Sequence, residues 1–204
     1  IFLTSFTVRS QEKAFYIYLS ILWVLLVYNA IMQTTDPQEE LIIEVDENNS
    51  IKGPITRHNA HTIQGTYYRT IYILIRNSNG EILLQKRSST KDLYPNCWDL
   101  SVGGHVNFES SYIDAAIREL KEEMNLLATP EDMIFKGEVL VKLPFSGEFF
   151  NVFEYHLKNN DIIKVSEDEV SSIKWLSIDL IKESMQKKSL LWYGRPLQVI
   201  NTLY

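Results

Sequence analysis

Gly103-Gly104-His105-Val106 opens the stretch that decides the fold of this chain, and Arg118-Glu119-Leu120-Lys121-Glu122-Glu123 closes it. Between them, Ser111 and Asp114 fit a capping box, in which a serine side chain caps a helix and an acid three residues on caps it in return. This pattern predicts a helix from about residue 112 to about residue 124. Its apolar residues recur at helical spacing and predict one buried stripe: Ile113, Ile117, Leu120 and Met124.

Three glutamates lie on a neighbouring face of the same predicted helix. Glu119, Glu122 and Glu123 stand at positions i, i+3 and i+4, where side chains are neighbours and like charges repel. A divalent cation would offset the repulsion, and carboxylate ligands suit Mg²⁺ or Mn²⁺. The alternative is a solvated acidic face beside Arg118 and Lys121. The glycine turn before the helix and Arg118 favour the metal site.

The bulk composition limits the classes of function. The 204 residues are 45% hydrophobic and 23% charged, with a formal net charge of -6. This acidic balance argues against a general nucleic-acid or acidic-lipid binder but allows a small anionic substrate. The single cysteine, Cys97, excludes an internal disulfide framework and favours a reducing compartment, which we expect to be the cytoplasm. The sequence does not fix the oligomeric state.

The segment from residue 14 to residue 32 contains no charged residue and suits a membrane anchor or a signal sequence. The alternative is a gene-model artefact or fragment, because the chain begins with Ile1 and a polar lead follows Met32. We therefore divide the chain into an apolar segment, residues 1–35, and a domain, residues 36–204. Membrane association is expected only if the apolar segment is genuine.

Runs of β-branched and aromatic residues predict the strands of the domain. The expected strands are 41–45, 66–76, 81–87, 99–102, 134–143, 148–157 and 173–176, with a hairpin turn over 77–80. Residues 52–65 read as irregular, with Gly53-Pro54 as a breaker. A short helical turn is expected at 129–132, and helices at 178–187 and 195–203, with Ser177 capping the first.

Several polar side chains outside the acidic helix are candidates for the site. His58 and His61 could ligate a metal if they lie on a helix, although surface loop histidines are the alternative. Arg87 and Lys91 could contact phosphate, because guanidinium forks onto phosphate oxygens, although a solvated edge is the alternative. Arg69 is a further candidate for substrate binding.

The spacing of these residues resembles the Nudix hydrolase family. The family signature requires a glycine, a glutamate, an Arg-Glu step and a Glu-Glu pair, and this chain supplies most of it in register. Upstream, the chain resembles the branch that includes isopentenyl-diphosphate isomerases and their hydrolase relatives. The residues that carry this second resemblance are Gln85, Arg87, Lys91, Pro95, Trp98, Gly104 and His105.

The resemblance implies an α/β fold, a Nudix-type α/β/α sandwich with a mixed sheet. It implies metal-dependent hydrolysis of a diphosphate linked to a nucleoside, sugar or prenyl moiety. By resemblance, Mg²⁺ or Mn²⁺ is held by Glu119, Glu122 and Glu123, and one of the last two orients or deprotonates water. Glu169 is a further candidate base and Glu148 an acid near the metal. Arg87, Lys91 and Gly104 are expected to bind the substrate, with Gly103 shaping the loop.

Three departures from the family pattern affect these expectations. Ser110 stands where the signature has a glutamate, so Arg118 lacks its usual partner unless Glu109 reaches it. Losses in such supporting residues often cost roughly 10–100-fold in activity or metal affinity. Asn125 replaces the glycine that ends the helix, which is a mild change. Gly103 stands where the isomerases have a cysteine, so hydrolysis is favoured over isomerisation. A binding module that has lost turnover is the alternative.

Overall fold

The computed structural model describes residue 34 and residues 36–143 and 146–204. The chain divides into two units between Thr35 and Asp36, and the second, Asp36–Tyr204, is the one described below. The readings of residues 14–32 as an anchor or a signal fall outside the described residues. Among the described helices, none is long and apolar enough to cross a membrane. The cytoplasmic location stays a prediction.

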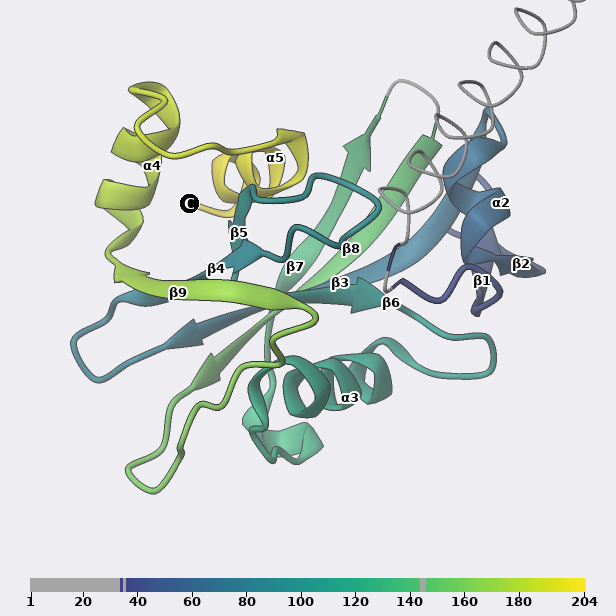
Figure 1. The fold of residues 1–204 in the computed structure, drawn as a ribbon. Coiled ribbons are helices and arrows are strands. Elements are labelled where there is room, and N and C mark those ends of the chain that lie inside the picture. Colours follow the sequence, from purple (N-terminus) through teal and green to yellow (C-terminus); the bar gives the residue numbers. More distant parts are fainter. Residues whose placement is uncertain (1–33, 35, 144–145) are drawn as a thin grey trace, which may run out of the picture. The chain divides into compact units, whose positions relative to one another are not determined.

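Strand β3 (Thr66–Arg76) is the centre of a mixed sheet (Figure 1). It runs parallel to β8 (Ser146–His156) along its whole length and antiparallel to β1 (Leu41–Val45). On the outer sides, β7 (Ile134–Lys142) pairs with β8 and β2 (Ile51–Thr56) pairs with β1, both antiparallel. The mixed sheet predicted from the family resemblance is confirmed.

The second part of the sheet is built on β4 (Ile82–Arg87). It pairs with β5 (Trp98–Leu100) and β9 (Val170–Leu176), and it meets β3 only at the Arg76–Ile82 pair. The prediction of a single strand over 99–102 is wrong. After β5 the chain begins a new strand, β6 (Val102–His105), which pairs with β3. Ser101 marks the change, because its Oγ accepts from the Ile75 N–H (2.8 Å) and donates to the Leu83 carbonyl (2.6 Å). This side chain bridges the splayed strands β3 and β4.

Helices cover both faces of the sheet, as Figure 1 shows. Ile71, Ile73 and Ile75 pack in one core with residues of α3 (Tyr112–Met124). Tyr72 and Leu74, which alternate with them, pack in the other core with residues of α4 (Ile178–Gln186) and α5 (Gly194–Leu203). Alternate residues of a strand point to opposite faces, so β3 contributes to both cores. The predicted α/β/α sandwich is confirmed.

Helix α3 forms as the sequence predicts. Ser111 and Asp114 make the full capping box, and the C-cap Asn125 adopts the left-handed conformation with φ 55°. Asparagine tolerates that conformation better than most residues, which explains why the missing glycine is harmless. Leu120 and Met124 are buried, and Glu123 is buried with them. The helix therefore brings one carboxylate into the interior.

The prediction that residues 52–65 are irregular is wrong. They form β2 and helix α2 (Arg57–Thr62), which Thr56 caps by accepting from the Asn59 N–H at 3.2 Å. Gly53 and Pro54 lie within β2 rather than breaking it. Because β2 is an edge strand in the sheet order, the missing N–H of Pro54 can be accommodated there. The short turn at 129–132 is confirmed as the 3₁₀ helix η1 (Pro130–Asp132).

Candidate active site

One cavity of about 170 Å³ gathers most of the predicted site residues. Its walls come from strands β3, β4, β6 and β8, from helices α2, α3 and α5, and from the loops before β1 and β9. The predicted residues that line it are Arg87, Lys91, Gly103, Gly104, Arg118, Glu119, Glu122, Glu123, Glu148 and Glu169.

Buried carboxylates form one side of the cavity. Glu123 is 5% exposed, and Gln85 Nε2 donates to its Oε2 at 2.9 Å. Burial, followed by the charges of Glu119 and Glu169, holds the pKa of Glu123 well above its usual range. Burial also raises the pKa of Glu119 to about 8, although Arg118 opposes the shift. Both side chains therefore favour the protonated form unless positive charge is brought beside them.

The paired glycines allow backbone and side chains to approach closely. A Cβ atom at Gly104 would overlap the carboxylate of Glu119. Only glycine at this position therefore allows the Glu119 side chain to pack against β6. A Cβ atom at Gly103 would stand 2.7 Å from Cε1 of Tyr72, which is too close. Both glycines therefore fit the loop-shaping role that the sequence predicts for them.

Arg118 ties the acidic helix to the glycine loop. It forms ion pairs of 2.9 Å with Glu119 and with Glu122. Its Nη2 also donates to the His105 carbonyl at 3.0 Å and to Asn107 Oδ1 at 3.2 Å. Asn107 is thus a partner on the loop side that sequence reasoning missed.

The loop residues at the departure from the signature lie next to this network. Ser110 donates its N–H to the Asn107 carbonyl at 3.0 Å and does not line the cavity. Glu109, the expected substitute partner, is an exposed turn residue with φ 69°. Arg118 is held without either of them, which explains how the loop keeps its place.

The donor chemistry of the carboxylates fits a hard divalent cation, because all of the candidate ligands are oxygen atoms. Within residues 34, 36–143 and 146–204, however, no three His, Cys, Asp or Glu side chains are gathered closely enough to hold a metal ion. Arg118 and Gln85 instead hold the glutamates through hydrogen bonds and ion pairs. A cation bound there would have to displace these partners.

The two predicted phosphate contacts line the cavity but have internal partners. Lys91 pairs with Asp36 and Glu169, and these anions raise its pKa although burial lowers it. Arg87 donates from Nε and Nη2 to the Leu93 carbonyl at 3.1 and 2.9 Å. A bound phosphate would have to share or replace these partners.

The structure does not bring Arg69 to the cavity. Its guanidinium donates to Asn49 Oδ1 at 2.8 Å and to the Asn49 carbonyl at 2.9 Å, and it lies 5.1 Å from the ring centre of Tyr112. The physical reason is the strand period: Thr70, the next residue of β3, lines the cavity, so Arg69 points to the other face.

Two arginines on the opposite wall escaped sequence reasoning. Arg195, in the first turn of α5, forms an ion pair with Glu148, which also accepts from the Tyr68 hydroxyl. Arg57, at the start of α2, pairs with Asp36 at 3.1 Å and Asp92 at 2.8 Å. Both arise from long-range packing of elements far apart in sequence, which no local motif signals.

The histidines divide between surface and cavity. His58 is exposed on α2, whereas His61 lines the cavity and meets His105, with 3.1 Å between their Nε2 atoms. Burial lowers the pKa of His61 to about 3 and that of His105 well below its usual value, and Arg57 adds to both shifts. Both imidazoles are therefore neutral near pH 7, and one donates to the other.

The NUDIX domain family matches residues 66–194, more than half of the chain and the whole of the acidic helix. The chain belongs to this family. It is 40% identical over 87 residues to an uncharacterized Nudix hydrolase of Pseudomonas aeruginosa, covering 43% of this chain and 51% of that protein. It is 29% identical over 169 residues to isopentenyl-diphosphate Delta-isomerase I of Camptotheca acuminata, covering 73% and 72%. The predicted branch of the Nudix superfamily is confirmed.

The fold agrees with solved structures. A crystal structure of a Deinococcus radiodurans protein matches with a TM-score of 0.68 and 23% identity, over 81% of this chain and 99% of that one. The chain spans about half the length of two Nudix hydrolases that it matches, 51% of the Pseudomonas aeruginosa protein and 54% of one from Streptomyces coelicolor. The family is that of the diphosphate hydrolases.

Proposed function

We propose that this protein hydrolyses a diphosphate linked to another moiety and uses Mg²⁺ or Mn²⁺ to do so. The observation that carries the proposal is the gathering of Glu119, Glu123 and Glu169 in one cavity. Beyond the effect of burial, Glu119 and Glu169 raise the pKa of Glu123, and Glu169 also raises that of Glu119. Lys91 and Arg87 line the same cavity and supply the positive charge that phosphate oxygens require.

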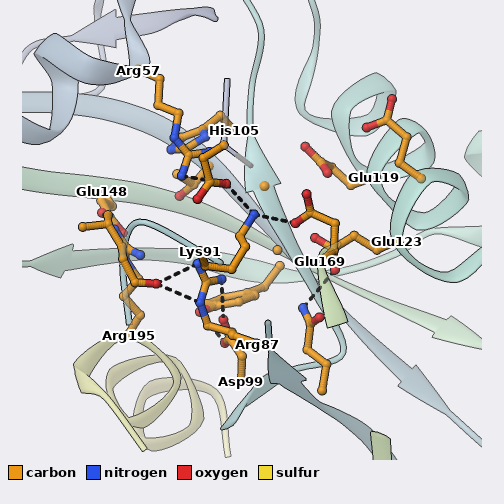
Figure 2. A pocket seen from close by; sticks show the side chains of 18 of the residues that line it. Arg57, Arg87, Lys91, Asp99, His105, Glu119, Glu123, Glu148, Glu169 and Arg195 are labelled. Atoms are coloured by element: carbon orange, nitrogen blue, oxygen red, sulfur yellow. Dashed lines mark hydrogen bonds and ion pairs between the residues drawn. The ribbon is translucent and has the colours of Figure 1, made fainter. Parts of the chain in front are cut away.

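In this proposal Glu119, Glu122 and Glu123 hold the cation. When bound, the metal neutralises phosphate oxygens and lowers the pKa of an attacking water. Glu169 lies beside Glu119 and Glu123, held by Lys91 (Figure 2), where it can orient the water or accept its proton. A phosphate that takes Lys91 as its partner would release the carboxylate of Glu169 for that task.

A panel of nucleoside, sugar and prenyl diphosphates, incubated with Mg²⁺ or Mn²⁺, tests the proposal through phosphate release. We expect metal-dependent turnover of at least one class. Binding of a diphosphate with no turnover of any class would contradict hydrolysis and favour the binding module.

Ser110 is the feature that favours a binding module. Against it, Arg118 keeps two loop partners, the His105 carbonyl and Asn107, and so retains its anchoring role. An anchored loop favours an active hydrolase over a module that has lost turnover.

Isomerisation is the less supported reaction. Gly103 occupies the position at which the isomerases of this branch carry a cysteine by resemblance, and it lines the cavity. The single cysteine, Cys97, is buried and is not among the lining residues. Its pKa is raised by burial, which keeps the thiol protonated and poorly reactive.

A further inference from the structure

Glu40 is a carboxylate of the cavity to which the proposed function gives no role. It is the last residue before β1, its side chain is 16% exposed, and it lines the cavity together with Arg118, Glu119 and Glu122. The neighbouring Glu39 is exposed and is not among the lining residues. The fold therefore turns one of two adjacent glutamates into the cavity that the acidic helix borders.

The backbone on both sides of Glu40 fixes its place. The Glu40 carbonyl accepts from the N–H of Arg57, the first residue of α2, at 2.8 Å. On the other side, β1 is hydrogen-bonded to the loop that follows β6, because the Phe108 N–H donates to the Leu41 carbonyl at 2.9 Å. Glu40 is therefore held beside the same loop that anchors Arg118.

Two basic side chains near Glu40 do not offset its charge. His105 Nδ1 is 3.7 Å from Glu40 Oε2, which is too long for a hydrogen bond. Burial holds the pKa of His105 well below its usual value, so this imidazole is neutral near pH 7. Arg57 is already shared between two acids, Asp36 at 3.1 Å and Asp92 at 2.8 Å. Neither side chain therefore neutralises Glu40.

Arg118 is the cation that complements Glu40. Burial raises the pKa of Glu40, and the charge of Arg118 is the strongest influence in the opposite direction. The effect is mutual, since Glu40 is among the carboxylates that raise the pKa of Arg118 although burial lowers it. The guanidinium forms its ion pairs with Glu119 and Glu122, each at 2.9 Å. Glu40 thus acts on the charge of Arg118 while other carboxylates hold it.

A bound cation would change what Arg118 requires. A cation held by Glu119 and Glu122 competes with the guanidinium for the same carboxylates. Two positive groups close together in a buried cavity repel each other, so the affinity for the cation depends on a further anion that offsets Arg118. The loop partners of Arg118, the His105 carbonyl and Asn107, are neutral and cannot supply that charge.

We propose that Glu40 is a positioning residue of the cation site, and that it offsets the charge of Arg118 while the acidic helix binds the cation. Arg118 then keeps its two bonds to the glycine loop instead of competing for the metal ligands. The negative charge that the loop lacks at Ser110 is in this way supplied from the start of β1. The inference rests on the proposed function, because it requires the cation site of that function.

Calorimetric titration of Mn²⁺ into the full chain tests the inference. Glu40→Gln keeps the shape of the side chain and removes its charge, so we expect Mn²⁺ to bind about tenfold more weakly than in wild type. Glu39→Gln is the matched control, because it removes the adjacent charge at an exposed position, and it should leave the affinity unchanged. Thermal melts of the metal-free proteins show whether each variant is folded. If Glu40→Gln does not fold, Glu40→Asp withdraws the charge by one methylene group and should weaken Mn²⁺ binding in the same direction.

A second substitution separates charge compensation from a merely structural role. Ser110 donates its N–H to the carbonyl of Asn107, the loop partner of Arg118, so Ser110→Glu brings a carboxylate to Arg118 from the loop side. We expect Ser110→Glu to restore most of the Mn²⁺ affinity that Glu40→Gln loses, and to change the affinity of wild type much less. A structural defect caused by Glu40→Gln would not be repaired by a charge introduced elsewhere.

The outcomes separate this inference from the proposed function. Weaker Mn²⁺ binding in Glu40→Gln with restoration by Ser110→Glu would uphold the inference, and absence of turnover in the same proteins would contradict the hydrolase alone. Equal Mn²⁺ affinity in wild type and folded Glu40→Gln, an equal loss in Glu39→Gln, or a loss that Ser110→Glu does not restore would overturn the inference alone. Absence of Mn²⁺ binding by wild type would overturn both.

Discussion

Two ends of the cavity handle buried charge in opposite ways. The carboxylate end consists of Glu119, Glu122, Glu123 and Glu169, and the polar end consists of Arg57, His61, His105, Glu148 and Arg195. At the carboxylate end, Glu119 and Glu123 have raised pKa values because burial and neighbouring acids act together. At the polar end, Arg195 and Glu148 neutralise each other within one ion pair. In the proposed function, a cation from outside completes the first arrangement. The second is balanced by ion pairs within the protein.

The difference explains why the family motif marks one end of the cavity and not the other. The motif concentrates ligands on one helix, where local spacing alone sets the charge density. The polar end is assembled from α2, β6, β8 and α5, which meet only in the folded chain. We therefore expect changes at the first end to affect turnover most.

The largest effect is expected from Glu123→Gln, which removes one charge from the carboxylate end and keeps the acceptor for Gln85. If the bound cation contributes several kcal/mol to the reaction, turnover of any active diphosphate should fall roughly 1000-fold. The exposed Glu131→Gln is the matched control and should keep wild-type turnover. Normal turnover in Glu123→Gln would sink the metal assignment.

A smaller loss is expected from Gly104→Ala, since the added methyl group displaces the carboxylate of Glu119. The obstacle is a flexible side chain, so the fold should survive while turnover falls roughly 10–100-fold. Gly194→Ala is a control, because its Cβ would meet only Gln198 Nε2, at an ordinary 3.8 Å. Thermal melts and phosphate release measure both variants, and equal activity in the two would contradict the packing role of Gly104.

The pH dependence of stability should have opposite signs at the two ends. In the metal-free protein, the pKa of Glu119 is raised from 4.5 to about 8. The unfolded chain releases that proton first, so its contribution to stability falls as pH rises from about 4.5 to about 8. The pKa of His61 is lowered from 6.5 to about 3, so its contribution falls as pH drops from about 6.5 to about 3.

Denaturant unfolding over a pH series, without metal, measures both contributions. In wild type, Glu119 should lower the free energy of unfolding by up to about 1.4 kcal/mol per pH unit as pH rises from about 4.5 to about 8, and Glu119→Gln should remove this loss. His61→Gln should remove a loss of unfolding free energy of up to about the same size as pH drops from about 6.5 to about 3. Parallel pH profiles for wild type and both variants would show that neither group is perturbed in this way.

The smallest effect is expected from Ser110→Glu, which restores the family's glutamate beside the carboxylate end. Arg118 already has two loop partners, so the gain in turnover should stay below about 10-fold. Ser110→Gln is the uncharged control. A gain far above that range would mean that Asn107 is a poor substitute, and no gain would mean that it fills the role completely.

Local patterns predicted the fold well. The capping box fixed α3, the β-branched run fixed β3 over Thr66–Arg76, and Ser177 caps α4 as expected. The failures share one cause, which is tertiary context. Ser101 splits the expected strand because it bridges β3 and β4, and Pro54 remains in a strand because that strand is an edge.

The candidate site divides in the same way. Residues of the acidic helix and the glycine loop could be predicted, because their spacing in sequence carries the pattern. Arg57, Arg195 and the His61–His105 contact could not, because each depends on packing between distant segments. Arg69, the further candidate for substrate binding, lies away from the site because the alternation of β3 directs it to the other face.

Calorimetric titration of Mn²⁺ tests the central claim most directly. We predict one site in the wild-type protein, an affinity at least about tenfold weaker in Glu123→Gln and unchanged in Glu131→Gln, and diphosphate hydrolysis that rises with occupancy of that site. Equal Mn²⁺ affinity in wild type and Glu123→Gln, or hydrolysis that proceeds at full rate with the metal chelated, would contradict it.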